Sequence, residues 1–523
     1  MEEENTRAVI GKNSFWELIS KIIEKIGAVV FTIILARFLL PESFGAYSLT
    51  ISVALIFIAA INYSVDRTMM KYVSDALGKK RKSLASAYFK YIFKKKVMFS
   101  LIASILLIIL SYPLAVYVFK KPFLFPSLLI SGAYIFVLAL ESSYESLFYV
   151  FKKVKGKAIK ETFKQFFRIS TILIIFLFIA KSYYVVGVIF GLILTSIFVL
   201  IFIRKYMEKS AFFIFKKEAK VKIDKKRVTG FFYYMLLISF IGTILSYTNV
   251  VLLGIFLPDS MYIGLYSSAI ALIWGLTGML NLSSVFLPVF TQIKEKNLEV
   301  GFNKILRYSL ILTVPAAFGI LALSRYIIFF IYGESYLEAS IILSVMAFMI
   351  IEGVNGSIIF TLFSAKEKLK YFTKIIAYTF FMNITLSIIL IKVILSYTNS
   401  QLLASTGAAV SALISNYFFF ILLIIGLKRK IKIKIEYVNF VKPLIASLIM
   451  FFSILGLLNL VKDINLIFGI FLVFVGVIIY LLVLFAIKGA CIEDIKTFIE
   501  ILPATNLYKL RASVLDYGKI KEI

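Results

Sequence analysis

The residue types that most enzymes use for catalysis are nearly absent from this sequence. It contains no histidine and a single cysteine, Cys491. An intramolecular disulfide, a cysteine metal cluster, a His-ligated metal and Ser-His-Asp catalysis are therefore excluded. No GxxxxGK[ST] sequence is present, so we expect no ATP hydrolysis by the chain. The sequence predicts no catalytic residue, no metal site and no cofactor, and it indicates that the chain is not an enzyme.

The first apolar segment carries the charged residues Glu17, Lys21, Glu24 and Lys25. Charges inside an apolar segment are costly and often mark a substrate or ion pathway. Positions 17, 21 and 24 share one helical face, and this face is predicted to line a cavity, with Lys21 and Lys25 as its cations. The alternative is an amphipathic helix end with simple helical ion pairs, Glu17 with Lys21 or Lys21 with Glu24.

Two carboxylates, Glu141 and Glu352, are predicted near the middle of apolar segments. Glu145 lies one helical turn from Glu141, and Asn355 shares a face with Glu352. We expect these side chains to face a cavity rather than lipid. A cycle of protonation could then couple transport to an ion gradient, because burial and exposure shift the protonation of a carboxyl. The alternative is that they pair with cations and hold helices together.

Three further residues are weaker candidates for a site. Arg67, beside Asp66, could serve as a cation at the cytoplasmic mouth of a cavity, although an interfacial ion pair at a helix end is the preferred interpretation. Trp274 is predicted near mid-span, whereas Trp usually lies at the membrane interface. Pro315 is predicted to kink its helix, either as a hinge or as a static bend.

The composition shows which elements must position these side chains. Hydrophobic residues make up 61% of the 523 residues and charged residues 16%, far from the balance of a soluble protein. A helix needs about 20 mostly apolar residues to cross a bilayer. The sequence predicts fourteen such helices, at residues 15–40, 44–64, 97–118, 123–151, 168–181, 184–203, 231–257, 263–289, 308–331, 339–363, 375–392, 402–427, 443–461 and 466–487.

The positive charge supports this topology. With the N-terminus in the cytoplasm, 51 of the 58 Lys and Arg residues fall in cytoplasmic segments and seven on the other side, as the positive-inside rule requires. Both termini are then cytoplasmic. The net charge of +30 needs no nucleic acid, because anionic lipids attract Lys and Arg beside the membrane.

The chain also contains an internal repeat. Pro41-Glu42-Ser43 matches Pro258-Asp259-Ser260, and the segment 141–146 matches 352–357 at an offset of 211 residues. Helices 1–6 and 7–12 are thus predicted to be parallel repeats about an axis along the membrane normal. The predicted parts are a lobe at 1–210, a basic linker at 211–230, a second lobe at 231–427, a basic linker with two appended helices at 428–487, and a cytoplasmic tail at 488–523.

Three features together carry a family resemblance. They are the 6+6+2 helix plan, the segment ARFLLPESFGAYSLTIS at 36–52 and the segment LTVPAAFGILALSRYIIFFIYGESYLEAS at 312–340. The chain resembles the polysaccharide-flippase (Wzx-type) branch of the multidrug/oligosaccharidyl-lipid/polysaccharide (MOP) exporter superfamily. The resemblance implies a multi-pass protein of the plasma membrane with two six-helix lobes around a cavity of alternating access, as in MATE transporters. It also implies that the cargo is a polyprenyl-phosphate- or pyrophosphate-linked oligosaccharide, moved to the outer leaflet. For such a cargo, Lys21 and Lys25 are the expected phosphate contacts. Arg67 could capture phosphate at the cytoplasmic mouth, and Trp274 could stack on a sugar.

Two rival functions remain open at this point. A multidrug or metabolite antiporter, or a lipid II-type flippase, would use the same fold, but the basic face of the first helix favours an anionic cargo. A membrane-embedded transferase or polymerase would need a large outer loop, and the longest outer connection has only about a dozen residues. We expect a monomer whose partners are the lipid-linked oligosaccharide and anionic membrane lipids, with glycosyltransferases or a polymerase of the same pathway as further candidates, and no nucleic acid.

Overall fold

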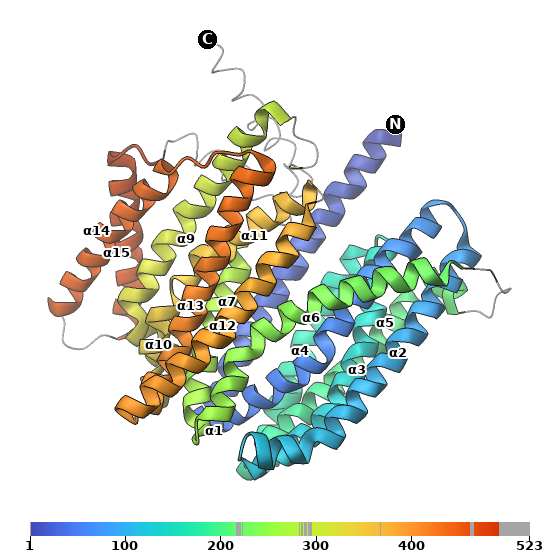
Figure 1. Cartoon of the computed structure of the whole chain (residues 1–523), viewed down its shortest axis with the longest axis horizontal. Helices are drawn as coiled ribbons and strands as arrows, with labels where there is room; N and C mark the ends of the chain where they lie inside the picture. Colours follow the sequence, from blue (N-terminus) through green and yellow to red (C-terminus); the bar gives the residue numbers. More distant parts are fainter. Residues whose placement is uncertain are drawn as a thin grey trace. The chain divides into compact units, whose positions relative to one another are not determined.

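The computed structural model describes residues 2–215, 221, 223–281, 283, 286, 290, 295–366, 368–460 and 465–490. Within these ranges every regular element is a helix (Figure 1). Twelve of the helices are long and apolar enough to cross a membrane. The predicted tail lies outside the described residues from 491 onward, as do residues 216–220 and 222 of the predicted linker.

Helix α1, Glu2–Gly78, covers two of the predicted membrane segments in one element. The two parts meet at Leu40, whose φ of 59° and ψ of 169° are not helical, and Pro41 follows directly. A proline disfavours the helical conformation of the residue before it, so the break falls where the sequence places it. The predicted segments 15–40 and 44–64 are therefore two halves of a kinked helix.

One compact unit spans Trp16–Ser267. After α1 it contains α2 (Lys82–Pro113), α3 (Phe125–Val150), α4 (Val154–Phe178), α5 (Tyr184–Phe215), α6 (Lys225–Phe256) and the start of α7 (Ser260–Leu280). Helix α3 packs between α2 and α5, and α4 packs against α5.

The other compact unit combines Met1–Phe15 with Ser268–Ile523. Its described helices are α9 (Glu295–Tyr332), α10 (Ala339–Met346), α11 (Met349–Ala365), α12 (Leu369–Thr398), α13 (Gln401–Gly426), α14 (Val438–Leu460) and α15 (Leu466–Ala486). Helices α12 and α13 form a closely packed pair, and α14 packs on both α9 and α15. Helix α6 groups with the preceding helices here, whereas the sequence assigned residues 231–257 to the second lobe. The lobe boundaries stay a prediction.

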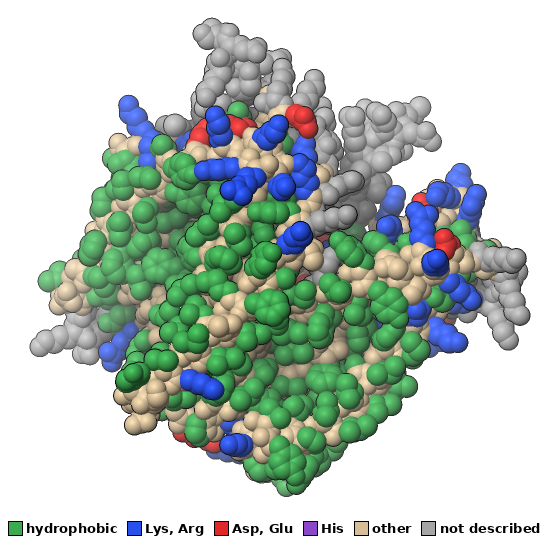
Figure 2. Space-filling view, in the orientation of Figure 1, with side chains coloured by type: hydrophobic (Ala, Val, Ile, Leu, Met, Phe, Trp, Pro, Cys, Tyr) green, Lys and Arg blue, Asp and Glu red, His purple; other side chains and the backbone are tan. Residues whose placement is uncertain are grey.

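Apolar side chains cover the middle of the helices in each unit, and Lys and Arg side chains gather near the helix ends (Figure 2). Large residues in the middle of α14 and α15 illustrate this, with Phe452 65% and Phe474 64% exposed. A soluble monomer rarely exposes apolar surface on this scale. The surface is that of a multi-pass membrane protein whose helices face lipid.

Helix α4 differs from its prediction in a way that matters for the site. It begins at Val154, so most of the segment 152–168, predicted as a cytoplasmic loop, is helical. The loop was predicted because seven of its residues are Lys or Arg. A hydropathy reading cannot recognise a helix whose cations are neutralised by side chains from other helices.

Each predicted copy contains a helix turn with the same backbone hydrogen bond. Between α3 and α4 the amide of Lys153 bonds the carbonyl of Phe148, and between α11 and α12 the amide of Lys368 bonds that of Phe363. The matching residues are 215 positions apart, one helical turn from the sequence offset of 211. Glu141 lies seven residues before Phe148, whereas Glu352 lies eleven residues before Phe363.

The proline-containing segments of the repeat pack against each other with reciprocal geometry. A Cβ placed on Gly45 would lie 1.9 Å from the carbonyl oxygen of Ser260, and one on Gly264 would lie 1.9 Å from that of Pro41. The backbones of α1 and α7 thus touch where the two sequence segments match. Only glycine permits so close a crossing.

Lys121 fixes the end of α6 to the connection between α2 and α3. Its side chain is buried, and its ammonium donates to the carbonyls of Leu257 at 2.6 Å and Gly254 at 3.0 Å. A cation at this end of a helix also complements the helix dipole. Burial lowers the pKa of Lys121, and the nearby Asp259 carboxylate opposes that shift.

Replacement of this lysine should loosen the contact. We expect Lys121→Met to lower the free energy of unfolding by about 1–3 kcal/mol, because two carbonyls at the end of α6 lose their donor. Thermal unfolding in detergent measures the loss. Lys120→Met is the control, since this neighbouring side chain is exposed, and an equal effect of both substitutions would contradict the role of Lys121.

Candidate functional site

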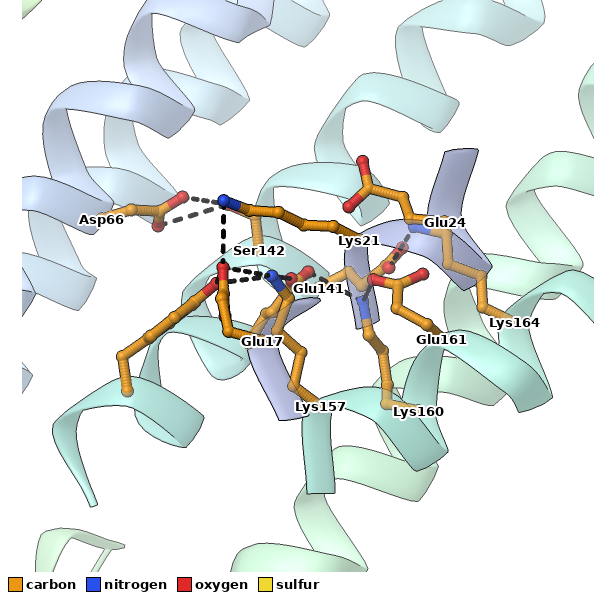
Figure 3. Close-up of polar contacts among 12 residues, drawn as sticks. Glu17, Lys21, Glu24, Asp66, Glu141, Ser142, Lys157, Lys160, Glu161 and Lys164 are labelled. Carbon is orange, nitrogen blue, oxygen red and sulfur yellow. Dashed lines mark hydrogen bonds and ion pairs between the residues drawn. The ribbon is translucent and has the colours of Figure 1, made fainter. Parts of the chain in front are cut away.

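Four cations form a row on one face of α4: Lys157, Lys160, Lys164 and Arg168. At 100° per residue their positions fall within an arc of about 80°. Figure 3 shows the three lysines among carboxylates of α1, α3 and α4 itself. We call these four residues the α4 cation row.

The part of the row toward the N-terminal end of α4 is formed by Lys157 and Lys160, both buried. Glu145 of α3 lies between them, with one carboxylate oxygen 3.0 Å from the Lys160 ammonium and the other 4.0 Å from that of Lys157. Lys160 also pairs with its neighbour Glu161. Lys157 donates to the Tyr149 hydroxyl at 2.5 Å. Tyr149 in turn donates to Glu17 of α1 at 3.0 Å.

The part of the row toward the C-terminal end of α4, Lys164 and Arg168, contacts residues of α3 and α1. The Lys164 ammonium lies 2.6 Å from one oxygen of Glu141, and the second oxygen of that carboxylate is buried without a hydrogen-bond partner. Arg168 stacks over Phe31 at 4.0 Å and donates to the Gly27 carbonyl at 3.1 Å. Its Nε is a buried donor without an acceptor. The row therefore has unused hydrogen-bonding capacity at this end.

A second buried ion pair joins three helices beside the row. Lys96 of α2 is fully buried, and its ammonium lies 3.2 Å from a carboxylate oxygen of Asp66 of α1. Ser142 of α3 bonds both side chains. The sequence suggested Arg67 as the partner of Asp66, but Arg67 is exposed and stacks over Tyr63 at 5.1 Å. Arg67 as a site for phosphate capture stays a prediction.

The charged residues predicted on α1 lie at the edge of the ion pairs around the α4 cation row. Lys21 and Glu17 are 3.7 Å apart, which confirms the helical pair expected from their spacing. Lys25 lies 3.8 Å from Glu24, with both side chains close to 40% exposed. Lys21 and Lys25 are thus more accessible than Lys157 and Lys160. Their contact with phosphate stays a prediction.

The corresponding helices of the second copy carry no such row. At the offset of 215 residues, the positions of Lys157, Lys160, Lys164 and Arg168 are occupied by Phe372, Ile375, Thr379 and Asn383. Phe372 packs on Phe360 with ring centroids 4.3 Å apart. The charged face belongs to the first copy, and none of the four counterpart positions carries a charge.

Glu352 has a different setting from Glu141. It is buried in α11, and in the described part of the chain no Lys or Arg nitrogen lies within 4.0 Å of it. Asn355 is fully buried and donates to Thr313 of α9 at 3.3 Å, so it links two helices. Both carboxylates lie inside their units. The sequence did not indicate that only Glu141 has a cation beside it.

The remaining candidates are not connected to the cation row. Trp274 of α7 is 44% exposed, so its indole ring is accessible for stacking. Pro315 lies inside α9, which continues as one helix from Glu295 to Tyr332. Among the described residues no group of three or more acidic or cysteine side chains is placed to hold a metal ion. Stacking by Trp274 and hinge motion at Pro315 stay predictions.

The sequence analysis missed the α4 cation row because it assigned these lysines to a loop. The signal was present in the spacing of Lys157, Lys160, Lys164 and Arg168, which repeats at three or four residues, as on one face of a helix. Glu161 within the same stretch was a further sign that the charges are paired. In the structure each of the three lysines of the row lies beside a carboxylate.

Residues 34–341 match the sequence model of a family described as polysaccharide biosynthesis protein. The match covers more than half of the chain. The chain belongs to the polysaccharide biosynthesis protein family. This membership confirms the resemblance to the polysaccharide-flippase branch of the MOP superfamily. A comparison with curated protein sequences gives no match.

Solved structures show the same fold in related transporters. A lipid II flippase, MurJ, in an inward closed conformation superposes with a TM-score of 0.68 at 20% identity, covering 90% of this chain and 97% of that one. A multidrug resistance MATE family transporter of the MOP superfamily gives a TM-score of 0.54 at 13% identity over 80% of this chain and 95% of its own. A eukaryotic MATE transporter gives 0.57 at 12% identity over 82% and 96%. The chain therefore has the MurJ and MATE fold.

Proposed function

We propose that this protein is a flippase of the cell membrane that moves polyprenyl-phosphate- or pyrophosphate-linked oligosaccharide from the cytoplasmic to the outer leaflet by alternating access. The sugar and phosphate of such a cargo cannot cross hydrocarbon unaided, because desolvating each hydroxyl costs several kcal/mol and a phosphate far more. The fold and the family membership support a flippase or transporter of lipid-linked cargo. We further propose that this cargo is an anionic, lipid-linked oligosaccharide.

The α4 cation row is the observation that carries this proposal. Buried cations on one helix face are costly unless they pair with an anion, and a phosphate could take the place of a carboxylate that pairs with them here. We assign the phosphate contact to Lys157 and Lys160, with Lys21 and Lys25 of α1 at its more accessible edge. The first copy of the repeat would hold the phosphate, since the four equivalent positions of the second copy carry no charge.

The proposal includes the predicted plan of fourteen membrane-spanning helices with both termini in the cytoplasm. The twelve spanning helices count α1 once, although it has two apolar halves on either side of Leu40, and they omit α4. Leu177 and Phe178 near the end of α4 are 78% and 83% exposed, as expected of side chains that face lipid. Counting α1 twice and adding α4 gives fourteen.

Glu352 and Glu141 remain the proposed coupling carboxylates. Glu352 is the stronger of the two, because no Lys or Arg neutralises it among the described residues. A proton or cation from solution could do so instead. Glu141 already has Lys164 at 2.6 Å, which favours its structural role in holding α3 to α4.

The test is direct flipping by the purified protein in vesicles. A fluorescent polyprenyl-pyrophosphate-linked sugar is added, and its appearance in the other leaflet is followed by chemical quenching, with and without a pH gradient. We expect protein-dependent flipping, and a dependence on the gradient if protonation is coupled. No flipping, together with export of cationic drugs by the same vesicles, would instead support the MATE-like antiporter.

A further inference from the structure

We propose that Glu145 and Glu161 act as built-in counter-ions that hold Lys157 and Lys160 while the site is empty, and that a phosphate-bearing ligand displaces Glu145. This inference rests on the proposed function and specifies how its anion site works. Neither carboxylate would be a passive structural partner. Both would set the affinity of the site for the anion.

The Glu145 carboxylate lies between two lysines of the α4 cation row. Its two oxygens contact two different ammonium groups, Lys160 at 3.0 Å and Lys157 at 4.0 Å. Lysine binds phosphate as a point charge, so two ammonium groups that share one carboxylate could share a phosphate in the same way. Glu145 therefore occupies the place in which the phosphate would lie.

The side chains of the two lysines and their two carboxylates differ in exposure. The side chain of Glu145 is 25% exposed, whereas those of Lys157, Lys160 and Glu161 are 7%, 0% and 5% exposed. The carboxylate is the member that a ligand meets first, and the lysines lie behind it. A glutamate side chain can rotate away about three bonds, so exchange requires no change in the backbone.

The positive charges of the α4 cation row are balanced by carboxylates. Four carboxylates, Glu17, Glu141, Glu145 and Glu161, lie within 4.0 Å of its lysines. Without them, four neighbouring cations would repel one another inside the protein. With all of them in place, a bound phosphate would lie against like charges only a few ångströms away. Exchange of a carboxylate for the phosphate avoids both costs.

The experiment measures binding of farnesyl pyrophosphate, a short polyprenyl pyrophosphate, to the purified full chain in detergent. Glu145→Gln keeps the size of the side chain and removes its charge. We expect it to tighten binding about tenfold, because the lysines no longer have a competing anion. Glu161→Gln should act in the same direction, and it provides the test should Glu145→Gln fail to fold.

The matched control is Asp75→Asn, which removes one negative charge from an exposed helical pair with Lys79 outside the cluster. Its affinity for farnesyl pyrophosphate should equal that of the unmodified protein. Unchanged or weaker binding in folded Glu145→Gln and Glu161→Gln would overturn the counter-ion inference alone. Absence of binding, equal competition by farnesol, or binding that persists after Lys157→Ala with Lys160→Ala would overturn the proposed phosphate site itself.

Discussion

Lys160→Met should lower the free energy of unfolding by about 3–5 kcal/mol and abolish binding of farnesyl pyrophosphate. The side chain is fully buried, and its loss leaves Glu145 and Glu161 without the ammonium that both contact. Breaking a buried ion pair by removing one partner is strongly destabilising for this reason. Thermal unfolding in detergent gives the first effect, and a binding titration gives the second.

A paired variant separates stability from binding. Lys160→Met together with Glu161→Gln removes a cation and an adjacent carboxylate, so part of the stability should return. Binding of the pyrophosphate should stay lost, because the second ammonium of the site is still missing. Lys79→Met is the control for charge removal, since it breaks an exposed pair worth less than about 1 kcal/mol. Full binding by the folded paired variant would contradict the assignment of Lys160 to the site.

Gly45→Ala should prevent the chain from folding normally. The added Cβ would lie 1.9 Å from the carbonyl oxygen of Ser260, a backbone atom that cannot rotate away. Helix α1 or α7 would have to move, and overpacking of this kind costs about 1–3 kcal/mol or more. Gly264→Ala should have the same effect, since it meets the carbonyl of Pro41 at the same distance. The measurement is the yield of monodisperse protein and its melting temperature.

Gly319→Ala provides the comparison for this prediction. Gly319 lies in the long helix α9, and a Cβ added there meets no heavy atom within 4 Å. Alanine favours a helix by about 1 kcal/mol over glycine, so this variant should be as stable as the unmodified protein or slightly more. Equal melting temperatures for Gly45→Ala and Gly319→Ala would show that α1 and α7 do not cross this closely.

The sequence predicted the helical architecture well because hydropathy is a local signal. The break before Pro41 and the paired segments around Pro41 and Pro258 could also be found, since proline and glycine restrict the backbone directly. The close packing of Gly45 on Ser260 could not be predicted. It depends on two segments more than 200 residues apart, and similarity between them does not imply contact.

The candidate site was only partly predictable for a related reason. Glu17, Glu141 and Glu145 were identified because a charge in an apolar segment is unusual. Their partners Lys157, Lys160 and Lys164 were assigned to a loop, because a cluster of lysines resembles the cytoplasmic flank of a membrane helix. Which lysine pairs with which carboxylate depends on helix packing. The partner of Asp66 shows this, since it is Lys96 rather than the adjacent Arg67.

The central claim is that the first copy of the repeat binds the phosphate of a lipid-linked cargo through α4. A polyprenyl pyrophosphate carrying a photoreactive group beside the phosphate tests it most directly. After illumination of the purified protein, the crosslinked peptides are identified by mass spectrometry. The account predicts crosslinks to α4 between Val154 and Phe178 and to the facing parts of α1 and α3, reduced by excess farnesyl pyrophosphate. Crosslinks confined to α9–α15, or insensitive to that competitor, would contradict it.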